Sequence, residues 1–362
     1  MAYTAIDDPS AYFHIQLYVG NNPTGQSITN DANAGDFQPD WLWIKSRDTS
    51  GGSGVNFVQD STRGTTKDLH TSNDEAEHTN SNMLGSFDSD GFTIGSSASD
   101  NINKASDNYV AWQWKANGGT RTTNTESGDN PGGGYQANTT AGFSIVDYTG
   151  TGSAGTMAHG LGAVPHVILF KARSEASNDW AVYHQGNTSA PETDFLRLNT
   201  NGATTDNSNF MNDTAPTSSV FTVNTGSKVN SDGETYIAYC FTEKQGYSKF
   251  GSYTGNNAAD GPFVYTGFKP AWVMTKRTDS TSSWFVFDNK RSPSNVVDDI
   301  LFPNGNDAET TNSSSGAIDM LSNGFKIRGT NSNFNAASST QIYMAFAEHP
   351  FVSSEGVPTT AR

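Results

Sequence analysis

Short runs of apolar and aromatic residues, separated by long polar stretches, set the pattern of this chain. In the run 41–45, two tryptophans and a lysine fall on one face of an extended strand, and Leu42 and Ile44 fall on the other. Because both faces carry apolar residues, we predict a strand in the middle of a sheet, buried on two sides. An Asp-Gly pair at 90–91 and an Asn-Gly pair at 323–324 precede further apolar runs, as in hairpin turns. The chain is therefore predicted to meander through antiparallel strands.

The same pattern occurs three times along the chain. Each copy opens with Tyr-x-Gly, continues through a proline to an apolar run that ends in lysine, and closes with an aromatic-x-Ala-aromatic quartet. The apolar runs end at Lys45, Lys171 and Lys276, which are separated by 126 and 105 residues. The closing quartets begin at Tyr109, Tyr236 and Tyr343. A period of about 105 residues fits a sandwich domain and exceeds any solenoid repeat, so we predict an all-β protein of three tandem antiparallel, jelly-roll-like β-sandwich repeats.

The repeats define the expected domain boundaries. We place an N-terminal arm at 1–11, repeats at 12–117, 141–245 and 246–351, and a C-terminal tail at 352–362. The Gly/Asn/Thr-rich stretch 118–140 is predicted to be a flexible linker. Since no such spacer divides the second repeat from the third, these two are expected to form a rigid pair from which the first can separate. Docking on a partner is expected to use the short arm, for example by adding a strand to the partner, with a face of the first repeat as the alternative.

Composition and charge narrow the classes of function. The chain has only ten Leu but 21 Phe, 13 Tyr and 7 Trp. Because leucine favours helices and aromatic residues favour strands, this composition opposes a helical fold. With 21 Lys and Arg against 37 Asp and Glu, the net charge of −16 opposes binding to nucleic acid or to anionic membranes. The sequence contains no run of 18 apolar residues, so no membrane span is predicted, and the first residues lack the pattern of a signal peptide. The single cysteine, Cys240, excludes a disulfide within the chain and is expected to be a structural strand residue.

No catalytic motif is evident, so no catalytic residue and no cofactor is assigned. Acidic residues gather at 74–77 and at 307–309, in the same loop of the first and third repeats, while the second repeat has Phe195-Leu-Arg-Leu198 there. We interpret both acidic loops as solvated. The main alternative is a binding site for a hard cation such as calcium, and a more distant alternative is a pair of catalytic carboxylates of a glycosidase. The seven histidines show no pair at metal-ligand spacing, so whether a metal binds is left open.

The candidate ligand-binding residues come from two recurring features. Asp60 with Arg63 and Asp288 with Arg291 each follow an aromatic strand. Such a pair usually braces a loop as a weak ion pair, and a ligand contact is the alternative. The tryptophans at the start of the preceding strands, Trp180 and Trp284, are either core residues or a carbohydrate platform.

Longer motifs at 4–13 (TAIDDPSAYF), 142–152 (GFSIVDYTGTG), 247–255 (YSKFGSYTG) and 346–354 (FAEHPFVSS) extend over essentially the whole chain. In these motifs the sequence resembles a family of repeat proteins from marine tailed bacteriophages. The resemblance implies a lectin/glucanase-type, concanavalin A-like β-sandwich in a virion or tail-fibre-like protein. It carries no catalytic motif and no defined ligand site.

The resemblance therefore predicts a bacteriophage virion structural protein, not an enzyme, on the tail or the capsid surface. It would be a tail fibre, an appendage or a capsid-attached fibre involved in adhesion to the host, with other virion proteins and host-surface glycans as partners. It would be made in the host cytoplasm without a signal peptide and would form a homo-oligomer, a trimer by analogy. A glycan-degrading depolymerase and a purely architectural component of the tail or capsid are the alternatives.

Overall fold

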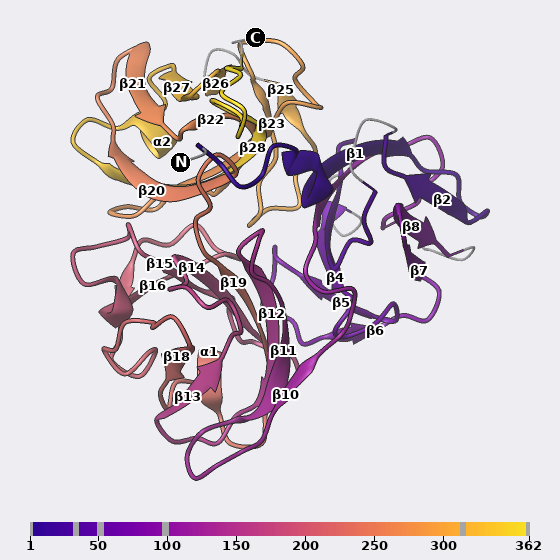
Figure 1. Ribbon diagram of the computed structural model, residues 1–362, viewed down its shortest axis with the longest axis vertical. Helices are drawn as coiled ribbons and strands as arrows, with labels where there is room; N and C mark the ends of the chain where they lie inside the picture. The colour runs from indigo at the N-terminus through magenta and orange to yellow at the C-terminus, as the bar shows by residue number, and fades with distance from the viewer. Residues whose placement is uncertain (1–2, 32–35, 49–53, 96–100, 312–315, 360–362) are drawn as a thin grey trace.

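The computed structural model describes residues 3–31, 36–48, 54–95, 101–311 and 316–359 of the chain. Their regular structure consists of antiparallel β-sheets with a few single-turn helices, which confirms the predicted all-β class. The strands form three lobes around a common centre (Figure 1). Lobe 1 spans 13–114, lobe 2 spans 122–241 and lobe 3 spans 248–350.

The strands of each lobe are as follows. Lobe 1 contains β1 (Phe13–Val19), β2 (Gln26–Thr29), β3 (Trp41–Ser46), β4 (Asn56–Asp60), β5 (Lys67–His70), β6 (His78–Thr79), β7 (Leu84–Asp88), β8 (Gly91–Ile94) and β9 (Asn108–Trp114). Lobe 2 contains β10 (Thr122–Asn124), β11 (Gly132–Asn138), β12 (Phe143–Thr149), β13 (Gly155–Ala158), β14 (Val167–Ala172), β15 (Ala181–His184), β16 (Asp194–Arg197), β17 (Thr205–Asp206), β18 (Val220–Val223) and β19 (Thr235–Phe241). Lobe 3 contains β20 (Ser248–Thr254), β21 (Asp260–Tyr265), β22 (Phe268–Arg277), β23 (Phe285–Asp288), β24 (Asp299–Ile300), β25 (Thr310–Thr311), β26 (Ala317–Leu321), β27 (Gly324–Arg328) and β28 (Thr340–Pro350). The helical turns are η1 (Pro9–Ala11), η3 (Pro191–Thr193), α1 (Ser227–Asn230) and α2 (Ser332–Asn335).

The large sheets of the three lobes share one strand order. It reads β1-β9-β3-β4 in lobe 1, β12-β19-β14-β15 in lobe 2 and β20-β28-β22-β23 in lobe 3. A smaller sheet lies opposite each of them, formed by β2-β8-β7, by β13-β18 and by β21-β27-β26. In lobe 1 the apolar side chains between the two layers include Leu42, Ile44 and Phe92. Each lobe is thus a two-layered sandwich.

The pairing of strands corrects one of the sequence alignments. In the three large sheets, Lys45 pairs with Val110, Lys171 with Ile237 and Lys276 with Ile342. The counterpart of Tyr109 and Tyr236 in lobe 3 is therefore Gln341 and not Tyr343. The two candidates lie two residues apart on the same face of β28, because side chains alternate along a strand, so the aromatic pattern alone could not separate them.

The second face of each large sheet meets the other two lobes. Trp41 and Trp43 point into a core that also contains residues of lobes 2 and 3. Across it, the ring of Trp41 stacks on that of Tyr239 with centroids 4.7 Å apart, and the Phe241 and Phe346 rings lie 5.9 Å apart. The sequence correctly predicted β3 to be a central strand with two buried faces. Its second face contributes to the central core shared by all three lobes.

The predicted flexible linker is part of a sheet. Residues 122–124 and 132–138 form β10 and β11, which pair with each other and with β12 of lobe 2. The glycines that suggested flexibility are needed for packing: a Cβ on Gly133 would lie 2.0 Å from the Asp147 carbonyl oxygen, and one on Gly134 2.6 Å from that of Thr122. The central core joins all three lobes, so the contacts give no support to the expectation that the first repeat separates from a rigid pair.

The predicted N-terminal arm lies against lobe 3. The Tyr3 hydroxyl donates to the Gly267 carbonyl at 2.8 Å, and the Thr4 hydroxyl donates to that of Gln245 at 2.8 Å. Ile6 is buried in the central core, and Asp7 accepts a hydrogen bond from the backbone N–H of Ser354 in the predicted tail. Residues 3–11 are thus part of the fold and do not form a free docking strand; positions 1–2 and 360–362 lie outside the described residues.

Two further findings concern the helices and the single cysteine. None of the helices among the described residues is long and apolar enough to cross a membrane. Cys240 is buried within β19, where burial raises the pKa of its thiol, as expected for a structural strand residue.

Candidate functional site

The two candidate tryptophans form part of the interior. Trp180 and Trp284 are 0% and 2% exposed. The indole N–H of Trp180 donates to the His70 carbonyl of lobe 1 at 2.8 Å, and that of Trp284 donates to the Arg197 carbonyl of lobe 2 at 2.8 Å. The counterpart in lobe 1 is Asn56, whose amide donates to the Phe302 carbonyl of lobe 3 at 3.0 Å. The core interpretation is confirmed, and a carbohydrate platform on these rings is wrong, because each ring is enclosed between lobes.

Asp60 and Arg63 also lie between lobes. Their side chains are 0% exposed, with Nε of Arg63 2.5 Å from Oδ2 of Asp60. The turn is closed by the backbone N–H of Arg63, which donates to Oδ1 of Asp60 at 2.9 Å. From lobe 2, the Tyr239 hydroxyl donates to Oδ2 of the same carboxylate at 2.7 Å. Burial alone would lower the pKa of the Arg63 guanidinium, but the neighbouring Asp60 carboxylate outweighs this effect and holds that pKa above its usual range, so Arg63 stays charged inside the protein.

Asp288 and Arg291 repeat this geometry between lobes 3 and 1. Nε of Arg291 lies 2.5 Å from Oδ2 of Asp288, both side chains are 0% exposed, and the turn is closed in the same way. Trp112 of lobe 1 donates its indole N–H to Oδ2 of Asp288 at 3.1 Å, and its ring lies 5.8 Å from the Arg291 guanidinium. The predicted ion pairs therefore exist, but as fully buried interface groups, which excludes direct ligand contact.

Two acids of the acidic loops, Glu77 and Glu309, join these pairs and are not solvated as predicted, whereas Asp74, Glu75 and Asp307 are exposed. The Glu77 carboxylate accepts two hydrogen bonds from Arg173 of lobe 2, at 2.8 and 3.0 Å, and Nη1 of Arg63 lies 3.3 Å from its Oε2. Glu309 is held in the same way by Arg47 of lobe 1, at 2.6 and 3.0 Å, with Arg291 at 3.0 Å. We call these groups, each with its buried aspartate, the Glu77 cluster and the Glu309 cluster.

The third interface, between lobes 2 and 3, lacks a matching glutamate and arginine. At the matching place the Thr204 N–H donates to the Thr278 carbonyl at 2.9 Å, just as Glu77 N–H donates to Arg173 and Glu309 N–H to Arg47, each at 2.7 Å. Threonines thus replace both members of the Glu–Arg pair together. This joint replacement is the signal in the sequence that could have identified the acids as interface residues.

A groove opens between lobes 1 and 3. It has a volume of about 400 Å³ and lies between β1, β28 and the turn after β23. Its polar lining includes Asp8, Asp31, Asn289, Lys290, Glu348 and His349. Nζ of Lys290 lies 2.7 Å from Asp31, and the Asn289 amide donates to Glu348 at 2.8 Å. Carboxylate and amide groups of this kind suit a hydroxyl-rich ligand. Nothing in the sequence pattern marked this groove, because its walls come from distant segments.

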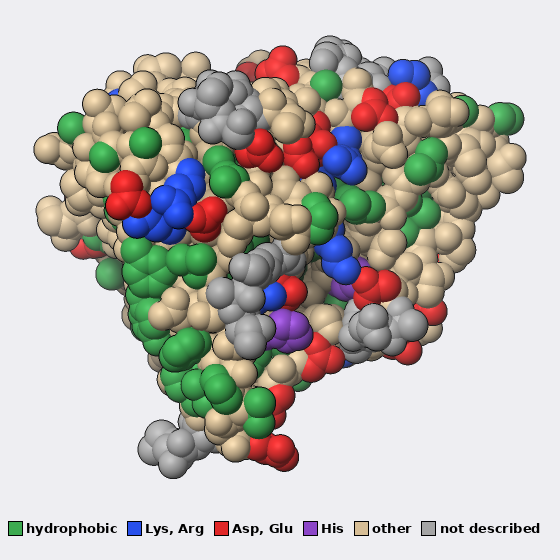
Figure 2. Space-filling model, turned by 90° about the horizontal axis from the view of Figure 1, so that it is seen from above, with side chains coloured by type: hydrophobic (Ala, Val, Ile, Leu, Met, Phe, Trp, Pro, Cys, Tyr) green, Lys and Arg blue, Asp and Glu red, His purple; other side chains and the backbone are tan. Residues whose placement is uncertain are grey.

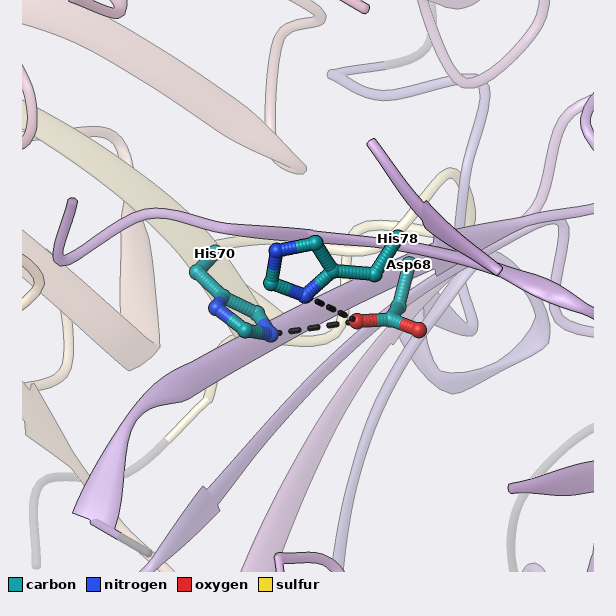
Figure 3. A group of neighbouring side chains, drawn as sticks. All are labelled: Asp68, His70 and His78. Carbon is teal, nitrogen blue, oxygen red and sulfur yellow. Dashed lines mark hydrogen bonds and ion pairs between the residues drawn. The ribbon is translucent and has the colours of Figure 1, made fainter. Parts of the chain in front are cut away.

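A cluster in lobe 1 has the composition of a metal site. Asp68, His70 and His78 present ligand atoms that all lie within 4.8 Å of one another. Figure 3 shows both imidazole rings facing the Asp68 carboxylate, whose Oδ2 is 3.1 Å from Nε2 of His70 and 3.6 Å from Nδ1 of His78. The sequence prediction that no histidines are suitably paired is wrong here, since the two lie eight positions apart but face each other across the β5–β6 pair. The calcium alternative for 74–77 gains no support, because Glu77 is bound to two arginines.

Figure 2 shows how charge is distributed on one face of the molecule. Lys and Arg side chains occur there in small groups beside Asp and Glu, without a broad basic patch on this face. The prediction against a nucleic-acid partner rests on the net charge of −16 and stays a prediction.

Fold and site together define an all-β protein of three sandwich lobes that enclose one core. The chain belongs to the family described as Domain of unknown function (DUF7483), whose model matches residues 8–350. The match includes all three lobes. No curated protein matches the sequence.

Proposed function

We propose that this protein is a structural component of a bacteriophage virion, a tail fibre, appendage or capsid-attached fibre, that contacts host-surface glycans. The resemblance to phage repeat proteins supports the setting. The observation that carries the proposal is the joining of the lobes: a common aromatic core and two fully buried Asp–Arg pairs fix their arrangement. A fixed arrangement of lobes suits a protein that bears load and presents a surface.

The groove between lobes 1 and 3 is the proposed site of glycan contact. Its carboxylates, amide and lysine can exchange hydrogen bonds with sugar hydroxyls, and Phe13 and Ile15 contribute apolar surface to its wall. Single contacts of this kind are weak. Homo-oligomerisation, as a trimer by analogy, would multiply them into useful avidity.

The depolymerase alternative would need a carboxylic acid that stays protonated until it donates to the leaving group. Burial alone would raise the pKa of Glu77, but its bonds to Arg173 and the charge of Arg63 lower it below the usual range. Glu309 is held by two arginines as well. Glu77 is therefore unsuited to the role, Glu309 is enclosed by Arg47 and Arg291, and the proposal favours a protein without enzymatic activity.

Two measurements test the proposal. Mass spectrometry of gradient-purified particles of a phage that encodes this chain should detect it, and its absence would overturn the virion assignment. Wild-type protein should bind host cells or a glycan array, and Lys290→Ala should bind at least several-fold more weakly. Lys326→Ala is the matched control, because Lys326 also pairs with one aspartate, Asp260, at 2.7 Å but lies outside the groove.

The possible outcomes separate the alternatives. If particles contain the protein but the wild type binds no glycan, the purely architectural alternative replaces adhesion. If purified protein releases reducing ends from host envelope polysaccharide, the depolymerase alternative takes its place.

A further inference from the structure

The strand pairing in lobe 1 brings two imidazoles and a carboxylate together. Asp68 of β5 lies directly opposite His78 of β6 in the antiparallel register, and His70 lies two residues further along β5. Side chains two residues apart share one face of a strand, so all three are presented on the same face. In a tetrahedral zinc site with ligands about 2.0–2.1 Å from the metal, neighbouring ligand atoms are about 3.4 Å apart. The distances of 3.1 and 3.6 Å from Oδ2 of Asp68 to the histidine nitrogens lie on either side of that value.

A second carboxylate lies on the opposite side of both rings. Oε2 of Glu75 is 3.4 Å from Nδ1 of His70 and 3.4 Å from Nε2 of His78. Each imidazole therefore has one nitrogen toward Asp68 and the other toward Glu75. Histidines that bind a metal through one nitrogen usually donate the N–H of the other to a carboxylate, which fixes the ring and makes the ligand more basic. Glu75 is placed to do this for both rings. The Asn73 amide shares the place beside His70, since its nitrogen lies 3.2 Å from Nδ1 of His70 and donates to Oε2 of Glu75 at 2.6 Å.

Burial gives the site its electrostatic character. The Asp68 side chain is 1% exposed, and its Oδ1 has no hydrogen-bond partner among the described residues. A buried carboxylate needs compensation by a positive charge. The His78 side chain, 42% exposed, leaves one side open to solvent. A cation could therefore enter from that side, and a water molecule could complete its coordination.

We propose that Asp68, His70 and His78 bind one Zn²⁺ ion, through Oδ2, Nε2 and Nδ1 respectively, with Glu75 holding the outer nitrogens of both imidazoles. Two imidazoles and one carboxylate suit zinc, whereas calcium and magnesium prefer oxygen ligands alone. The ion would tie β5 to β6. The loop between these strands carries Glu77, which holds Arg173 of lobe 2, so the zinc ion would also brace the contact between lobes 1 and 2.

The test measures zinc directly in protein freed of any histidine tag. After dialysis against micromolar Zn²⁺ and then metal-free buffer, elemental analysis should find about one zinc per wild-type chain. His70→Gln and His78→Gln should retain less than a tenth of that. His349→Gln is the matched control, because His349 is exposed on β28 and outside the cluster, and it should bind zinc like the wild type.

A second readout separates binding from folding. Zn²⁺ should raise the midpoint of thermal unfolding of the wild type and of His349→Gln over that in EDTA, but leave that of His78→Gln unchanged. Near-ultraviolet circular dichroism in EDTA should show His78→Gln folded. Zinc content equal in the wild type and His78→Gln, or no zinc in the wild type, would each overturn the proposal.

Discussion

At the scale of single residues, the main surprise is where the charged side chains lie. Glu77 and Glu309 were expected in solvent, yet each accepts hydrogen bonds from an arginine of another lobe. From its sequence alone, a loop rich in Asp and Glu is predicted to lie in solvent, since no residue nearby in the chain supplies the opposite charge. The partners Arg173 and Arg47 are distant in sequence and reach the acids only once the lobes have assembled.

Glu77→Gln should lower the free energy of unfolding by roughly 2–4 kcal/mol, because it leaves Arg63 and Arg173 without their shared carboxylate in a largely buried interface. Denaturant unfolding at pH 7 measures the change. Glu126→Gln, at an exposed position, should change stability by less than about 0.5 kcal/mol. The double variant Glu77→Thr with Arg173→Thr copies the third interface and should be more stable than Glu77→Thr alone. Equal stability of the double and single variants would contradict the role of the pair.

Three lysines at matching positions should make stability depend on pH. Lys45, Lys171 and Lys276 are 0% exposed, and burial lowers the pKa of each from 10.5 to about 8. Between these values the unfolded chain binds protons that the folded chain has released, so stability should rise as the pH rises from 8 toward 10.5. Lys171→Met should remove about a third of this rise, whereas Lys326→Met should leave it intact.

Denaturant unfolding between pH 7 and about 9.5 measures this effect. That range avoids higher pH, where buried tyrosines such as Tyr239, whose pKa burial raises well above 10, act in the opposite direction. A wild-type stability that is flat or falls over this range would show that the lysines do not release their protons in the folded protein.

At the scale of elements, the strands were more predictable than the connections. The run at 41–45 became β3 with both faces buried, as its alternation required. The stretch 118–140 was wrongly predicted to be a flexible linker, because glycine can have two opposite effects on a chain. It gives freedom to an isolated chain, but it also lets two backbones approach closely, and here the second effect decides: β11 pairs along its whole length with β12.

Gly133→Ala should therefore destabilise the protein by roughly 1–3 kcal/mol, because its Cβ would overlap the Asp147 carbonyl oxygen. Thermal unfolding compares it with Gly202→Ala, where the nearest neighbour of the added Cβ, Oγ1 of Thr200, lies 3.5 Å away and almost no loss is expected. Limited proteolysis should also spare 122–138 in the wild type. An early cut within that range, or equal effects of the two substitutions, would argue that these strands are only weakly held.

At the scale of the whole molecule, the lobes depend on one another. Each large sheet has one face in its own sandwich and the other in the central core, so an isolated lobe would expose the aromatic residues of that second face. For lobe 1 these include Trp41, Trp43, Trp112 and Trp114. A patch of this size is not tolerated on a monomeric protein in water. The single family match across residues 8–350 agrees with this dependence.

Calorimetry should accordingly show one cooperative unfolding transition for the whole chain, with equal calorimetric and van't Hoff enthalpies. A fragment comprising 1–117 should lack the sharp near-ultraviolet circular dichroism of packed tryptophans and should bind a hydrophobic dye. A separate early transition for lobe 1, or a stably folded monomeric fragment, would restore the expectation that this lobe is an independent domain.

The class of fold and the course of many strands and turns could be predicted from the sequence alone. Alternation along strands, Asp-Gly and Asn-Gly turns and the repeated lysines depend only on neighbouring residues, so they could be interpreted without a structure. The sequence also marked the residues of the interfaces, Asp60 with Arg63 and Asp288 with Arg291, although it could not tell that they are buried.

The contacts of those residues could be known only once the chain was folded. The central core, the Glu77 and Glu309 clusters, the groove and the Asp68–His70–His78 group all need strands or lobes to be brought side by side. In lobe 1 the register of β5 against β6 places His78 opposite Asp68, and a shift by one residue would turn His78 to the other face. Such long-range contacts are fixed by packing, because local propensity carries no information about which distant segment will supply the partner.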